Sequence, residues 1–148
     1  MIHAKAVNHI GIAVRSLEAN RTFYESVLGA RFAGIETVAD QRVRVAFFEL
    51  GPPGHEVRLE LLEPTSPDSP IAGFIEKRGE GLHHVAYTVD DIRQRLADLA
   101  ASSISLIDKT PRPGAHHTQI AFLHPRSSMG VLTELCQPAH DNLSEPTS

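Results

Sequence analysis

Four residues of the sequence have the side-chain types and the spacing of a metal site: His9, Glu60, His84 and Glu134. His84 follows His9 by 75 residues, and Glu134 follows Glu60 by 74. Two imidazoles and two carboxylates suit a divalent transition metal with open positions for water or a substrate. A carboxylate among apolar strand residues is costly to bury alone, and metal coordination removes much of that cost. These four residues are therefore the predicted metal ligands.

The spacing belongs to an internal repeat. Residues 8–14 align with residues 83–89, and residues 60–64 align with residues 134–138. Two matches in the same order predict a duplicated β-α-β-β-β unit. We therefore expect an α+β fold in which two paired modules, at about residues 5–65 and 80–138, form a shared concave metal-binding cavity. The whole of residues 1–138 is predicted to be one domain, followed by a polar tail over residues 139–148.

Side-chain alternation decides between two adjacent histidines. Successive side chains of a strand point to opposite faces, so His83 and His84 cannot both face the cavity. The register of the repeat selects His84. Taken singly, each candidate also has a plainer explanation: His9 as a packed histidine, and Glu60 as part of a solvated strand face with Arg58, which shares its parity. The repeat favours the metal site, because it aligns all four.

The elements that would carry these residues follow from apolar periodicity. Alternation predicts strands at 6–14, 43–50, 56–63, 83–89, 105–108, 118–124 and 131–136. Helical spacing predicts a helix that Ser16 caps and Gly29 stops, a short one at 71–75, and one that Asp90 or Asp91 caps. Residues 51–54 make a turn between two of the strands.

Composition excludes several classes of protein. The 148 residues carry a formal net charge of −4, which argues against binding to the nucleic-acid backbone. No apolar run approaches the ~20 residues that span a bilayer, so no membrane partner is expected. A single cysteine, Cys136, rules out an internal disulfide and fits a cytoplasmic or organelle-matrix location. The nine histidines favour metal or proton-transfer chemistry.

Other polar residues are weaker candidates. His116 and His117 follow Gly114 and precede a strand, where they border the site or form an exposed turn. Several cations either serve an anionic ligand or are ordinary surface charges: Arg42, Arg44, Arg58, Lys109, Arg112 and Arg126.

The repeat and several short motifs resemble the vicinal oxygen chelate superfamily, and within it the methylmalonyl-CoA epimerase family. The resemblance covers about residues 6–138. Its hallmarks lie at residues 59–64, 68–74, 81–84, 114–116, 122–125 and 130–135. The His and Glu positions alone are shared with glyoxalase I, and residues 68–72 and 114–116 favour the epimerase.

This resemblance implies an isomerase that interconverts (2R)- and (2S)-methylmalonyl-CoA by 1,1-proton transfer through a metal-stabilised enolate. Inverting the carbon needs two proton-transfer groups on opposite faces. The family's last-strand Glu corresponds to Glu134, and Asp40 stands where the family usually has its other Glu. An aspartate reaches one methylene less far than a glutamate.

The resemblance also implies a divalent metal, with cobalt first and manganese, nickel or zinc as alternatives, an acyl-CoA substrate in propionate metabolism, and a homodimer. No phosphate-cradling motif is present, so the CoA contacts stay unassigned. The alternative function is a glyoxalase I-type isomerisation of a glutathione hemithioacetal with the same ligands. An extradiol dioxygenase fits less well, because Glu60 occupies a position that oxygen chemistry needs open. A non-catalytic binding module would not need four ligand-type residues.

Overall fold

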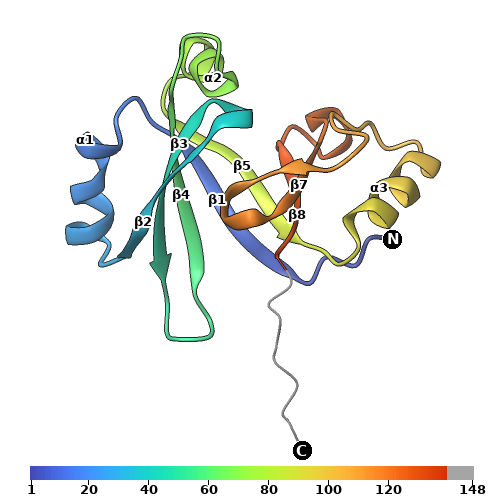
Figure 1. The fold of residues 1–148 in the computed structure, drawn as a ribbon, viewed down its shortest axis with the longest axis horizontal. Coiled ribbons are helices and arrows are strands. Elements are labelled where there is room, and N and C mark those ends of the chain that lie inside the picture. The colour runs from blue at the N-terminus through green and yellow to red at the C-terminus, as the bar shows by residue number, and fades with distance from the viewer. Residues whose placement is uncertain (140–148) are drawn as a thin grey trace, which may run out of the picture.

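The segments with alternating apolar residues form strands in both halves of the chain, and helices lie outside them (Figure 1). This computed structural model describes residues 1–139. The strands are β1 (Ala6–Ala13), β2 (Arg31–Val38), β3 (Val43–Leu50), β4 (Val57–Pro64), β5 (Gly81–Thr88), β6 (Arg112–Pro113), β7 (Gln119–Leu123) and β8 (Thr133–Gln137). The α-helices are α1 (Leu17–Thr22), α2 (Pro70–Arg78) and α3 (Ile92–Ala101), and short helical turns cover Phe23–Val27, Ala39–Gln41, Ala115–His117 and Pro125–Ser127.

All the strands join one mixed sheet in the order β2-β3-β4-β1-β5-β8-β7-β6. In each half the first strand lies parallel to the last, as β1 does to β4 and β5 does to β8. The antiparallel pair of β1 and β5 joins the halves at the centre of the sheet. The expected α+β fold of two paired modules is therefore confirmed. The domain limits of residues 1–138 stay a prediction, and from residue 140 on the predicted tail lies outside the described residues.

Alternation along the strands separates a face that packs against α1 and α3 from a concave face, one end of which packs against α2. On β4, Leu61 packs in a cluster with Leu17 of α1. Leu62 packs in a cluster with Ile71 and Ile75 of α2. On β8, Leu135 packs against the α3 side. Glu60 and Glu134 have the opposite parity to Leu61 and Leu135, so both carboxylates are directed to the same concave side.

The helix ends follow their predicted signals. The Ser16 side chain accepts a hydrogen bond from the Ala19 N–H, and that of Asp91 accepts one from the Gln94 N–H. Gly29 has a φ of 70°, which a glycine adopts without strain. The first helix ends in a π-helical turn, Phe23–Val27, before this glycine.

Two edge segments differ from the sequence prediction. The strand β2 was not predicted, because every second side chain along most of this edge strand is exposed and no apolar run marks it. The strand predicted at residues 105–108 is wrong: only Leu106 forms a bridge, to Leu123. The Phe122 N–H donates to the Asp108 carboxylate rather than to a backbone carbonyl, so the regular ladder does not continue there. None of the described helices is long and apolar enough to cross a bilayer.

Candidate metal centre

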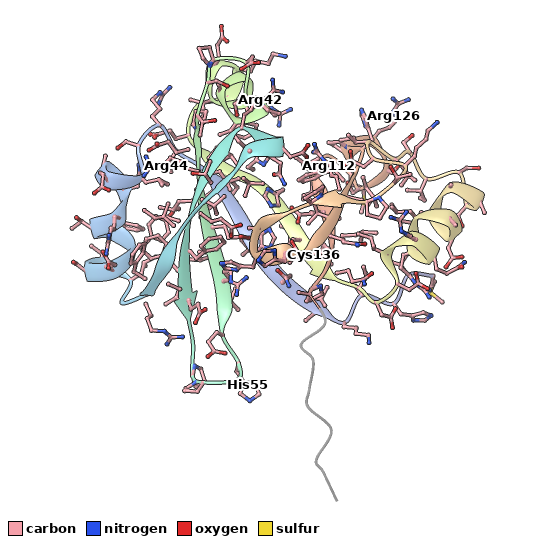
Figure 2. The ribbon with its side chains drawn as sticks, in the orientation of Figure 1. Arg42, Arg44, His55, Arg112, Arg126 and Cys136 are labelled. Atoms are coloured by element: carbon pink, nitrogen blue, oxygen red, sulfur yellow. The ribbon has the colours of Figure 1, made fainter. Side chains whose placement is uncertain are left out.

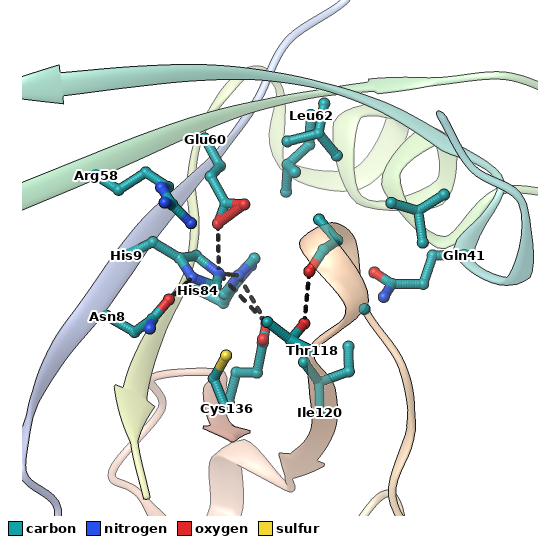
Figure 3. Close-up of a pocket in the computed structure, with 15 residues that line it drawn as sticks. Asn8, His9, Gln41, Arg58, Glu60, Leu62, His84, Thr118, Ile120 and Cys136 are labelled. Atoms are coloured by element: carbon teal, nitrogen blue, oxygen red, sulfur yellow. Dashed lines mark hydrogen bonds and ion pairs between the residues drawn. The ribbon is translucent and has the colours of Figure 1, made fainter. Parts of the chain in front are cut away.

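The two histidines of the repeat meet at the centre of the sheet (Figure 3). The Nε2 atoms of His9 and His84 lie 3.0 Å apart. The Glu134 Oε2 atom lies 3.0 Å from the His84 Nε2 and 3.6 Å from the His9 Nε2. One donor atom from each of the three side chains lies within 4.8 Å of the others, and all three residues are buried. The arrangement can hold a metal ion.

Glu60 reaches this group from one side. Its Oε2 atom is 2.8 Å from the His9 Nε2, yet it forms no well-directed hydrogen bond with the described residues. A buried carboxylate oxygen without a directed donor is costly, and a bound cation would remove that cost. The structure thus brings all four predicted residues together, with three in a tight cluster and Glu60 beside it.

Glycine at position 11 makes room for one of these rings. Gly11 lies directly opposite His84 in the β1–β5 pair. A Cβ atom there would overlap the Cε1 and Nδ1 atoms of His84 and lie 2.8 Å from its Nε2. The imidazole therefore occupies the space that any other residue would fill.

In the metal-free cluster, a protonated His9 imidazole contacts the carboxylates of Glu134 and Glu60. Burial lowers the pKa of His9, but its contacts with Glu134 and Glu60 outweigh burial and raise the pKa to about 9. Burial raises the pKa of Glu134, but its contacts with His84 and His9 prevail and lower it to about 2. Without a metal, the proton on His9 offsets part of the negative charge that a cation would otherwise neutralise.

This pairing predicts how the metal-free protein responds to alkali. Because the pKa of His9 rises from 6.5 unfolded to about 9 folded, its stabilisation is complete below pH 6.5 and is lost as the pH rises to about 9. We expect the melting temperature of the metal-free protein to fall across that window, and to fall less in the His9→Gln variant. Thermal melts in chelator-treated buffer from pH 6 to 9.5 measure the melting temperatures. An equal fall of the melting temperature with pH in the two proteins would contradict the prediction.

Asp40 lies near the cavity but outside it. It belongs to the short turn Ala39–Gln41, from which Gln41 lines the cavity. Its own side chain is about half exposed, and its Oδ2 atom lies 3.6 Å from the Arg112 Nη1. The structure does not bring Asp40 together with the four buried residues.

Most of the candidate cations are surface charges. Arg42 pairs with Asp68, Arg44 with Glu63, and Figure 2 shows Arg126 at the outer edge of the molecule. Arg58 differs, because it lines the cavity beside Glu60 (Figure 3). Its Nε is buried without a hydrogen-bond partner among the described residues, and its Nη1 lies 3.4 Å from the His116 Nδ1.

Several residues that line the cavity are not predicted from the sequence to belong to the site. The lining includes Asn8, Thr118 and Cys136, and burial raises the pKa of the Cys136 thiol to about 12, so it stays protonated. The repeat does contain a sequence signal for Asn8, since it aligns Asn8 with His83.

A second cavity of about 480 Å³ adjoins His84 on the side of Phe74 and Leu132.

The cluster fits a divalent transition metal on its own chemistry. Imidazole nitrogens and carboxylate oxygens are the ligands that cobalt, nickel, zinc and manganese share. The undirected Glu60 oxygen and the two facing Nε2 atoms are the features that a cation would satisfy. The identity of the ion is not fixed by these donors.

Comparisons with known proteins agree with the fold. The model of the glyoxalase/bleomycin resistance protein/dioxygenase superfamily matches residues 8–122. The uncharacterized protein YqjC of Bacillus subtilis is 48% identical over 94% of this chain and 96% of its own length. The mitochondrial methylmalonyl-CoA epimerase of Bos taurus is 40% identical over 88% of this chain and 73% of its own. A Streptomyces coelicolor methylmalonyl-CoA epimerase variant, solved with 2-nitronate-propionyl-CoA, has a TM-score of 0.86 at 35% identity, covering 92% of this chain and 96% of that one.

Proposed function

Because the chain belongs to the glyoxalase/bleomycin resistance protein/dioxygenase superfamily and, within it, to the methylmalonyl-CoA epimerase family, we propose that it interconverts (2R)- and (2S)-methylmalonyl-CoA. The membership predicted from the sequence motifs is confirmed. The observation that carries the proposed activity is the buried cluster of His9, His84 and Glu134 in a chain so similar to named epimerases. A homodimer and a place in propionate metabolism belong to the proposal, and light scattering tests the dimer.

The proposed ligands are His9, Glu60, His84 and Glu134, with cobalt as the first candidate ion. These residues would hold a divalent cation, which would supply Lewis-acid stabilisation of negative charge on the thioester oxygen. The chain's own contribution is to hold the acyl group so that a carboxylate reaches that proton. Burial of the cluster excludes water, which strengthens each of these electrostatic contacts.

Glu134 is the proposed first proton-transfer group. Its carboxylate lines the cavity, and a carboxylate is a group that can take a proton from carbon. A second group must deliver a proton to the opposite face of the carbon. Asp40 is the sequence prediction for it, and Glu60 is the other carboxylate that lines the cavity.

Two variants distinguish these carboxylates. Because the Asp40 side chain is directed to Arg112, we expect Asp40→Asn to slow epimerisation by less than about threefold. We expect Glu60→Gln to slow it by about 100-fold, within the range for the loss of a positioned acid–base group. Steady-state rates at saturating metal measure both. If Asp40→Asn instead exchanges the α-proton without inverting the carbon, Asp40 is the second group.

Arg58 supplies a cavity cation for the free carboxylate of a malonyl group. We expect Arg58→Met to raise the KM for methylmalonyl-CoA by about 10- to 100-fold, since a hydrogen bond to a charged group contributes ~1.5–3 kcal/mol. The matched control is Arg44→Met, which removes a surface arginine paired with Glu63. Equal KM values in both variants would show that Arg58 does not bind the substrate.

A substrate panel tests the proposed function itself. The metal-loaded protein is given one epimer of methylmalonyl-CoA, ethylmalonyl-CoA, or the hemithioacetal of methylglyoxal and glutathione, and products are separated by chromatography. We expect both epimers to appear from methylmalonyl-CoA. Turnover of the hemithioacetal alone would replace the proposal with a glyoxalase I-type isomerase.

A further inference from the structure

One residue is out of register immediately before each histidine of the cluster. The β1–β5 pair matches Val7 with Tyr87 and His9 with Ala86, so Asn8 is left over as a bulge. Further along, the same pair matches Gly11 with His84 and Ile12 with Leu82, so His83 is left over. A β-bulge re-aims neighbouring side chains and is common beside functional sites. Asn8 and His83 are 75 residues apart, the offset of the repeat.

Each bulged side chain touches the ring nitrogen of the following histidine that faces away from the cluster. The Asn8 Oδ1 lies 2.8 Å from the His9 Nδ1, and the His83 Nδ1 lies 2.9 Å from the His84 Nδ1. Asn8 is itself held, because its Nδ2 donates to the Thr88 Oγ1 at 3.1 Å. The His83 ring packs edge-on against Phe74, with ring centroids 4.8 Å apart.

These contacts constrain where the imidazole protons lie. An amide oxygen only accepts, so the His9 Nδ1 must donate to Asn8. Of the two facing Nδ1 atoms of His83 and His84, one donates and the other accepts. If His83 accepts, His84 carries its proton on Nδ1, and its Nε2 presents a lone pair to the cluster. Partners of this kind fix both the tautomer and the ring orientation of histidines that bind metals.

We propose that Asn8 and His83 are paired positioning residues: each bulge presents a hydrogen-bond acceptor to the Nδ1 of the next histidine, so that both Nε2 atoms point at one metal ion. The proposal rests on the metal site of the proposed function and is independent of the substrate. An amide and an imidazole occupy equivalent places, so the requirement is for an acceptor at the bulge rather than for one residue type.

Metal affinity separates this role from a merely structural one. The metal-free protein is titrated with Zn²⁺ in competition with a chromogenic chelator, alongside melting temperatures without metal. We expect Asn8→Leu and His83→Leu to weaken Zn²⁺ binding by about 10- to 100-fold. We expect His83→Asn, which copies the other bulge, to stay within about threefold of the wild type. Val7→Ala and Leu82→Ala are controls on the same strands and should leave the affinity unchanged.

The outcomes are distinct. Folded leucine variants that bind Zn²⁺ as tightly as the wild type would overturn the proposal, and so would His83→Asn binding as weakly as His83→Leu. A wild-type protein that binds no Zn²⁺ would overturn the metal site itself. Should a leucine variant fail to fold, ¹H–¹⁵N NMR of the zinc-loaded wild type decides. Protonated Nδ1 atoms on both His9 and His84 support the proposal, and ligation through either Nδ1 overturns it.

Discussion

Glu134→Gln should lower kcat for methylmalonyl-CoA epimerisation by about 1,000-fold at saturating metal. The amide is nearly isosteric with the carboxylate but cannot accept the α-proton, and loss of a positioned base costs about 10²- to 10⁴-fold. Glu134 is also one of the three clustered donors, so its replacement should weaken metal binding too. Metal affinity is therefore measured separately, and rates are compared only where each protein is fully loaded.

The matched control for this change is Glu49→Gln, which alters a carboxylate on β3 that pairs with Arg31 outside the cavity. We expect its rate to equal that of the wild type. If the metal-loaded Glu134→Gln variant keeps more than about a tenth of the wild-type rate, Glu134 is not a proton-transfer group.

Gly11→Ala should weaken metal binding by about 100-fold while the strand pairing is kept. The added Cβ would overlap the His84 ring, so the ring must leave the position from which its Nε2 meets His9 and Glu134. Changes that disturb the orientation of a ligating histidine typically cost about 10- to 100-fold in metal affinity. Chelator competition measures the affinity, and we expect catalysis to fall with it.

Gly73→Ala is the control for this glycine. It lies in α2, where an added Cβ would meet nothing within 4 Å, so metal affinity should not change. Wild-type affinity in a folded Gly11→Ala protein would show that the His84 orientation is not required for binding.

The convergence of the four buried residues was predictable because it depends on two simple periodicities. The repeat offset pairs His9 with His84 and Glu60 with Glu134, and strand alternation then puts equivalent residues on one face. The parity that Arg58 shares with Glu60 was also compatible with a solvated strand face, whereas the structure has both residues lining the cavity. Their roles as ligands stay a prediction until a metal is measured.

What the sequence did not reveal depends on contacts between distant strands. The bulges at Asn8 and His83 arise from the pairing of β1 with β5, and no local pattern marks a register shift. The direction of the Asp40 side chain depends on its turn and on Arg112, which is far along the chain. Strand β2 is not predicted from the sequence, because an edge strand with many exposed side chains lacks a clear run of apolar residues.

The central claim is that this cavity moves the α-proton of methylmalonyl-CoA with the help of a bound metal. Proton NMR of one epimer in D₂O, with cobalt-loaded protein and a metal-free control, tests it most directly. We expect loss of the α-proton signal and equilibration of both epimers only in the loaded sample. An α-proton signal that persists in the presence of cobalt-loaded protein would contradict the account.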